Sequence, residues 1–295
     1  FYVYILMQNI ALGTVQFGQP YGIANNSGQV SIEEIEMILE YAQKKGVDTL
    51  DTAINYGESE TLLGSIGVSN WNVITKISEV PIGCDNIYNW ISSSVSASLK
   101  RLKINCLSGI LLHKPEQLLF SEGDKIYSAL NKLKEEGCVK KIGISIYDPI
   151  ELDKIISRFP LDIVQAPFNI MDQRLISSGW LSKLYRSNID VHVRSVFLQG
   201  LLLMNSSERP QVFNRWESIW IIWNQFLCES KLSALQVCIR YALLKKEINR
   251  VIVGVDSLKQ LRQVLDAVSG NIPEIPSALS CNDLDLINPS RWKFN

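Results

Sequence analysis

Residues 31–52 read SIEEIEMILEYAQKKGVDTLDT, and this stretch contains the unit whose repetition decides the fold. Its first part predicts an amphipathic helix, because Ser31 and Glu34 have the spacing of a capping box and Gly46 stands where a helix-ending glycine belongs. Apolar side chains recur there at helical spacing, at Ile35, Ile38, Leu39 and Ala42. Residues 49–52 (TLDT) follow, with β-branched threonines on either side of Leu50 and Asp51, and are predicted as a strand. The stretch therefore joins one helix directly to the next strand.

The same alternation of apolar runs and amphipathic stretches recurs on both sides of this segment. Strands are predicted at residues 9–13, 49–52, 73–76, 107–113, 140–145, 161–165, 191–195 and 250–253. Helices are predicted at residues 31–45, 59–63, 86–102, 121–136, 215–229, 233–244 and 257–268, with a further one beginning at Asp148-Pro149. Because helices separate the strands, we interpret the strands as parallel, which favours an α/β fold of the (β/α)8 or TIM-barrel type.

A doubly wound parallel sheet is the alternative architecture. A dinucleotide-binding sheet of that kind should carry G-x-G-x-x-G after its first strand, and residues 12–18 (LGTVQFG) do not supply it. The barrel is therefore preferred. We expect one domain over residues 1–295, with a helical insertion at about 205–246 and a C-terminal tail at about 270–295.

The composition excludes several classes of protein. The 295 residues carry 29 Lys and Arg against 30 Asp and Glu, for a net charge of -1, which does not fit a nucleic-acid binder or a polybasic membrane binder. No apolar run approaches the roughly 18–20 residues that span a bilayer. The six cysteines show no C-x-x-C spacing, so we expect reduced thiols, no metal site and a cytoplasmic location. The oligomeric state is left open.

Polar side chains end five consecutive predicted strands. These residues are Asp51, Lys76, His113, Ser145 and Gln165, and Tyr56 follows the first of them closely. The carboxyl ends of barrel strands form the active-site face, and buried polar groups are costly without partners. Any one of these residues alone could be a capped or ion-paired strand end. Together they predict one active site.

A tyrosine, a lysine, an aspartate and a histidine can together transfer a proton to or from a carbonyl or alcohol oxygen. A phenol has an ordinary pKa of about 10, which a neighbouring ammonium lowers, and a carboxylate holds that ammonium in place. An imidazole can orient the substrate oxygen by a hydrogen bond. Side chains cannot supply a hydride, so the set implies a nicotinamide cofactor.

Seven segments in chain order resemble the aldo-keto reductase superfamily. They are Leu12-Gly13-Thr14, residues 51–60 (DTAINYGESE), Thr75-Lys76, Leu111-Leu112-His113, Gly143-Ile144-Ser145, Val164-Gln165 with Asn169, and residues 199–202 (QGLL). The similarity runs from about residue 10 to residue 268. It implies a barrel that binds NADP(H), or less often NAD(H), across its mouth. By this resemblance Tyr56 is the general acid, Asp51 and Lys76 tune it, and His113 orients the carbonyl.

The same resemblance assigns cofactor contacts. Ser145 and Gln165 would hold the nicotinamide carboxamide, and the remaining expected contacts are Gly13, Thr14, Arg194, Ser195, Gly254, Asp256, Ser257, Lys259 and Arg262. Two positions depart from the family pattern: Ile146 replaces an asparagine, and Arg194 replaces an aromatic residue that stacks on the nicotinamide. A guanidinium can stack on a flat ring. Pairing of Arg194 with a carboxylate or phosphate at the rim is the alternative.

The segment after the eighth strand bears on the choice of cofactor. Relatives that bind the 2′-phosphate often carry Lys-Ser and a later Arg, whereas this chain has Gly254-Val255-Asp256-Ser257. Asp256 would repel a 2′-phosphate but could accept from a ribose hydroxyl. Lys259 and Arg262 could restore phosphate affinity or be solvated helix charges, and Ser257 with nearby backbone N–H groups could cradle a phosphate. NADP(H) is favoured on the family resemblance, with NAD(H) as the alternative.

These observations predict an NAD(P)H-dependent reductase of a small aldehyde or ketone, sugar-like carbonyls included. Two alternatives stay open. The first is a regulatory or sensor protein that keeps the barrel and the cofactor with little turnover. The second is a non-redox barrel enzyme that uses Tyr56 and Lys76 as acid and base only.

Overall fold

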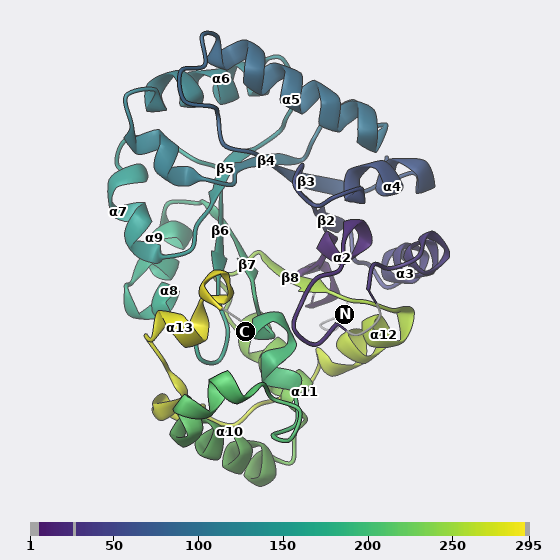
Figure 1. The fold of residues 1–295 in the computed structure, drawn as a ribbon, viewed down its shortest axis with the longest axis vertical. Coiled ribbons are helices and arrows are strands. Elements are labelled where there is room, and N and C mark those ends of the chain that lie inside the picture. Colours follow the sequence, from purple (N-terminus) through teal and green to yellow (C-terminus); the bar gives the residue numbers. More distant parts are fainter. Residues whose placement is uncertain (1–5, 26–27, 293–295) are drawn as a thin grey trace.

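The computed structural model describes residues 6–25 and 28–292. Eight parallel strands form a closed barrel in which each strand pairs with the next along the chain and the last pairs with the first (Figure 1). The strands are β1 (Ile10–Gly13), β2 (Thr49–Asp51), β3 (Asn72–Ile77), β4 (Gly109–Leu112), β5 (Ile142–Ser145), β6 (Ile163–Pro167), β7 (Asp190–Arg194) and β8 (Arg250–Gly254). This topology confirms the predicted (β/α)8 barrel. The first five residues of the expected domain and the last three of the expected tail lie outside the described part.

Helices surround the barrel, and α10 lies at its outer edge beyond α11 (Figure 1). The α-helices are α2 (Val15–Gly18), α3 (Ile32–Lys44), α4 (Ser59–Ile66), α5 (Ile87–Leu102), α6 (Gly123–Glu135), α7 (Leu152–Ile155), α8 (Arg174–Ser177), α9 (Trp180–Arg186), α10 (Glu217–Ser230), α11 (Ala234–Leu243), α12 (Leu258–Ala267) and α13 (Leu284–Ile287). Short 3-10 turns are η1 (Pro115–Leu119), η2 (Pro149–Glu151), η3 (Leu198–Leu203), η4 (Gln211–Trp216), η5 (Ser277–Leu279) and η6 (Pro289–Arg291). Among the described helices, none is both long and apolar enough to cross a membrane.

The predicted helix starts arise from local capping. Asp148 and Glu151 form a complete capping box at η2. At α3, Ser31 accepts from the backbone nitrogen of Glu34, yet the Glu34 side chain does not return to Ser31. The capping box expected there is therefore only half formed, because the Glu34 carboxylate binds α12 instead.

Every strand differs from its predicted bounds by one or more residues at one or both ends, and the differences at β4, β6 and β7 bear on the site. β6 continues to Pro167, which pairs with Arg194 of β7, so Gln165 lies inside the strand instead of at its end. β7 stops at Arg194, and Ser195 follows it with a φ of 61°. Leu107 makes only an isolated bridge before β4. Pairing with the neighbouring strand sets these limits, and a single strand's sequence does not show them.

An apolar layer fills the barrel below the polar residues. Ile74, Leu111 and Ile163 form a buried cluster of their own. Each stands two residues before a polar residue of the expected site, namely Lys76, His113 and Gln165, and alternate strand residues share a face. The cluster therefore forms the apolar layer of the barrel interior next to the layer of polar side chains.

Candidate active site

Lys76 is the centre of the polar group at the carboxyl end of the barrel. Its Nζ donates to Asp51 Oδ1 at 2.6 Å, to the Thr52 carbonyl at 2.9 Å and to the Tyr56 hydroxyl at 3.5 Å. Three acceptors match the three N–H bonds of an ammonium. The lysine side chain is 1% exposed, so these contacts replace its water. β2, β3 and the loop after β2 thus bring three predicted catalytic residues together.

The surroundings of Lys76 favour its charged form. Burial lowers the pKa of Lys76, but the negative charge of Asp51, the interaction with Tyr56 and their hydrogen bonds outweigh burial and raise it above its usual value. The residue is therefore an ammonium that donates to the phenol oxygen and stabilises negative charge there.

His113 faces Tyr56 across the mouth of this group. The two half-buried rings meet edge to face, with their centroids 6.3 Å apart. Burial first, and then the positive charges of Lys76, Arg194 and Lys114, lower the pKa of His113 from 6.5 to about 4. The imidazole is therefore neutral near pH 7 and offers one N–H donor beside the tyrosine hydroxyl.

Gln165 and Ser145 belong to the same network. Gln165 Nε2 donates to Asp51 Oδ2 at 2.7 Å, and Ser145 Oγ donates to Gln165 Oε1 at 3.1 Å. Both side chains are almost fully buried. Asp51 thus holds Lys76 with one oxygen and Gln165 with the other, which joins the residues expected to transfer the proton to those expected to hold the nicotinamide.

Arg194 lies on the opposite side of the mouth, over the ring of Tyr147. Its guanidinium is 4.6 Å from that ring's centroid and donates to the Ile146 carbonyl at 3.0 Å and to Ser195 Oγ at 3.4 Å. No carboxylate of the described residues lies within ion-pair distance of it. The following loop is strained, since Ser195, Leu198 and Gln199 have φ values of 61°, 49° and 53°.

Comparisons with known proteins show the family of this chain. The model of the Aldo/keto reductase family matches residues 9–275. The chain belongs to the aldo/keto reductase family. It is 28% identical over 219 residues to the oxidoreductase sirO of Leptosphaeria maculans, a match that covers 71% of this chain and 65% of that protein.

Two further similarities cover most of this aldo/keto reductase. It is 25% identical to the NADH-specific methylglyoxal reductase of Escherichia coli K12, over 83% of this chain and 85% of that one. Its fold is similar to that of the aldo-keto reductase AKR11C1 from Bacillus halodurans, with a TM-score of 0.72 at 18% identity, over 90% of this chain and 88% of the other.

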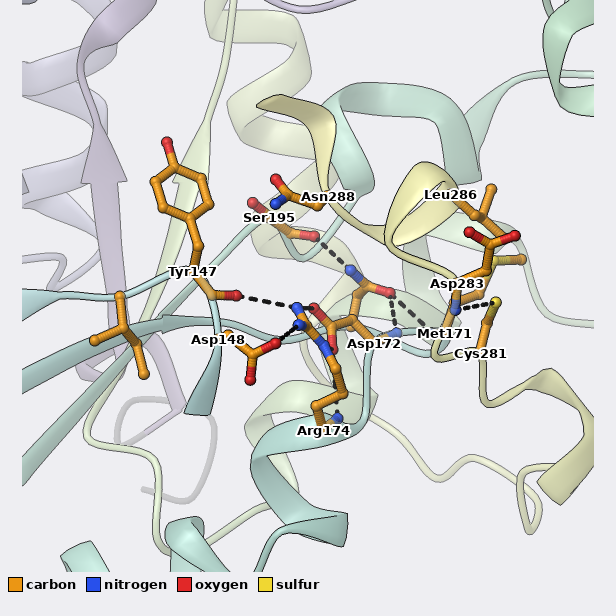
Figure 2. Close-up of polar contacts among 12 residues, drawn as sticks. Tyr147, Asp148, Met171, Asp172, Arg174, Ser195, Cys281, Asp283, Leu286 and Asn288 are labelled. Carbon is orange, nitrogen blue, oxygen red and sulfur yellow. Dashed lines mark hydrogen bonds and ion pairs between the residues drawn. The ribbon is translucent and has the colours of Figure 1, made fainter. Parts of the chain in front are cut away.

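A buried ion-pair network supports the loops of this aldo/keto reductase behind Arg194. Figure 2 shows Arg174 among Tyr147, Asp148 and Asp172, with its donors directed at all three. Asn169 beside them donates to the Ser195 carbonyl at 3.1 Å. Asp172 and Arg174 are not among the residues predicted from the sequence. The signal that could have found them is the run of polar residues 169, 172 and 174 directly after β6.

Five of the remaining predicted cofactor residues of this aldo/keto reductase lie at or directly after the ends of the paired strands β1 and β8. Gly13 pairs with Gly254 in register, and Thr14 donates to the Asp51 carbonyl and accepts from Ser59. Asp256 and Ser257 precede α12, where Ser257 is the N-cap.

Lys259 and Arg262 follow this group, in the first and second turns of α12. Both are exposed on α12, and the Arg262 guanidinium is 5.1 Å from the centroid of the Tyr41 ring. The structure thus brings Asp256 and Ser257 to the rim of the barrel and directs Arg262 toward α3.

A buried polar atom without a hydrogen-bond partner among the described residues lies beside Gly254, where β8 pairs with β1. Gln16 Oε1 has no hydrogen-bond partner among the described residues, and a Cβ at Gly254 would collide with the Gln16 carboxamide. A buried acceptor without a donor is costly, so a ligand that donates here would stabilise it. This feature, together with the Ser145–Gln165 pair, fits a polar dinucleotide across the barrel mouth.

Proposed function

We propose that this protein reduces an aldehyde or ketone, sugar-like carbonyls included, to the alcohol with NAD(P)H as the hydride donor. The observation that carries the proposal is the contact of one buried ammonium, Lys76 Nζ, with both Asp51 and the Tyr56 hydroxyl, beside a neutral His113. The set can donate a proton to an oxygen. It matches the acid half of a carbonyl reduction.

Each residue has one role in the proposed reaction. A nicotinamide held at this site would supply the hydride for reduction of the carbonyl. Tyr56 gives its hydroxyl proton to the carbonyl oxygen, and the phenolate that remains is stabilised by Lys76 until it takes up a proton from solvent. His113 donates a hydrogen bond that orients the same oxygen. Asp51 keeps Lys76 charged and in position.

Ser145 and Gln165 are proposed to bind the carboxamide of the nicotinamide. Their side chains supply one hydroxyl and one amide within 3.1 Å of each other, a combination that can both donate to and accept from an amide. Arg194 is proposed to lie against the nicotinamide ring, because its flat guanidinium already stacks on an aromatic ring.

The test is the Tyr56→Phe variant of the full chain, assayed with a panel of aldehydes and ketones and with NADH and NADPH. Turnover should fall by about 10²–10⁴-fold because the proton donor is gone. Dinucleotide binding, followed by quenching of tryptophan fluorescence, should be retained. Undiminished turnover would contradict the assigned acid. Tight cofactor binding by the unaltered protein without turnover of any carbonyl would favour the sensor protein instead.

A further inference from the structure

Glu34 connects the first turn of α3 to the first residue of α12. Its backbone nitrogen donates to Ser31 Oγ, while its carboxylate accepts from the backbone nitrogen of Leu258 at 2.6 Å. A negative charge at a helix N-terminus interacts favourably with the helix dipole and occupies a backbone donor that has no partner within the helix. The chain thus places its own anion at the start of α12.

The other polar groups at this helix start also have partners. Ser257 Oγ accepts from Gln260 N at 3.2 Å, and Gln260 Oε1 accepts from Asp256 N at 2.7 Å. A phosphate bound here would have to displace three acceptors, namely Ser257 Oγ, Gln260 Oε1 and the charged Glu34 carboxylate. The cradle expected from Ser257 and the nearby N–H groups is therefore already filled by side chains of this chain.

Asp256 adds a second carboxylate at the same place. It is half-buried, and its Oδ1 accepts from Asn25 Nδ2 at 3.1 Å. Burial raises the pKa of Asp256, whereas its hydrogen bonds with Gln260 and Asn25 lower it, with burial the larger effect. Among the described residues, no lysine or arginine forms an ion pair with Glu34 or Asp256. Two carboxylates therefore lie at the start of α12, whereas the cations of its first two turns, Lys259 and Arg262, are exposed to solvent.

We propose that Glu34 and Asp256 make this protein select NADH over NADPH. Phosphate sites of (β/α)8 barrels form after the last strands, at helix N-termini, and α12 is the helix that follows β8. A ribose 2′-hydroxyl can donate to the Asp256 carboxylate, as acidic residues accept from this hydroxyl in other NAD sites. A 2′-phosphate meets the two carboxylates there, while Lys259 is screened by water and Arg262 lies over the Tyr41 ring.

This inference rests on the proposed function, because it assumes that a nicotinamide dinucleotide binds. It departs from the expectation that NADP(H) is favoured, since that expectation comes from the family and the two carboxylates belong to this chain.

The test is equilibrium binding of NADH and of NADPH to the full chain, by fluorescence titration at low and at high salt. The unaltered protein should bind NADH at least about tenfold more tightly, the effect of about one unscreened charge contact. The variants are Glu34→Gln, which keeps an acceptor for Leu258 N, Asp256→Ser, and both together. Each single variant should improve NADPH binding, and the pair should improve it most.

The matched control is Glu36→Gln, which removes the same charge from an exposed position of α3. It should leave the preference unchanged, and high salt should narrow the preference of the unaltered protein. Equal binding of the two cofactors, tighter NADPH binding, or variants that behave like Glu36→Gln would overturn the inference while the proposed function stands. Binding of neither cofactor would overturn both.

Discussion

Gln165 Nε2 donates a hydrogen bond of 2.7 Å to Asp51 Oδ2, although the two residues lie 114 positions apart in the chain. Because the other oxygen of Asp51 binds Lys76, a single carboxylate links the proposed nicotinamide site to the proposed proton donor. A change at one end of this link should therefore be measurable at the other.

Asp51→Asn should both destabilise the fold and slow the reaction. The substitution keeps an oxygen near Lys76 but removes the charge that compensates a buried ammonium, a loss that typically costs about 3–5 kcal/mol. Urea unfolding gives the change in stability, and turnover gives the change in rate. In the Asp51→Asn/Lys76→Met double variant no uncompensated charge remains, so it should be more stable than Asp51→Asn alone. Purely additive losses would show that the two groups do not interact.

The stability of the protein should fall as the pH falls from about 6.5 toward 4, because the pKa of His113 drops from 6.5 to about 4 on folding. In that interval the unfolded chain binds a proton that the folded chain does not, so stability is complete above the unfolded pKa and is lost on acidification. The stability lost through His113 over this range is at most roughly 3 kcal/mol. Unfolding free energies measured across this range provide the check.

His192 should also lower the stability of the protein as the pH falls, so its contribution has to be measured with a separate variant. Burial, followed by Arg250, Lys141 and Lys76, lowers the pKa of His192 to about 3. His113→Gln and His192→Gln should each remove part of the slope, and the chain has two histidines in all. A slope that persists when both are replaced would contradict the assignment.

Arg194→Gln should raise the pKa of His113. After burial and Lys76, Arg194 is the next cause of the low value, ahead of Lys114. Titration of the two imidazoles by NMR measures the shift directly. Lys114→Gln, at an exposed residue, should raise the pKa by less. A His113 pKa that is unchanged or lower in Arg194→Gln would exclude the electrostatic link between the two residues.

Arg174→Met should cost about 3–5 kcal/mol of stability, because Asp172 is fully buried and would lose its partner. Arg174→Lys should recover only part, since an ammonium cannot reproduce the fork that binds Asp172, Asp148 and the Tyr147 carbonyl. Urea unfolding distinguishes the variants. The matched control is Arg158→Met at an exposed ion pair with Asp124, where the loss should be below about 1 kcal/mol.

The sequence predicts the barrel well because its signals are local. Apolar runs, amphipathic periodicity and helix starts such as Asp148-Pro149 lie within one or two turns of the chain. Parallel pairing then brings all carboxyl ends to one face, so Asp51, Lys76 and His113 could be expected together before any contact was known.

The contacts between distant elements could not be predicted in this way. Glu34 has the spacing of a capping box, and only the packing of α3 against α12 offers its carboxylate the Leu258 nitrogen instead. Gln165 lies inside β6, and not at its end, because the pairing of β6 with β7 continues to Pro167. In both places a contact with a distant element of the fold, and not the local sequence pattern, determines the position of the side chain.

The pairing of β1 with β8, in which Ile10 lies opposite Val251, also constrains how the chain folds during synthesis. This pairing adds contacts of long sequence separation, because β1 lacks one of its two neighbouring strands until the last strand has left the ribosome. Until then β1 exposes an edge, and nascent chains of this length are prone to associate through such edges. Asp51 and Lys76 lie on the neighbouring strands β2 and β3, so this ion pair can form before the two ends of the sheet join.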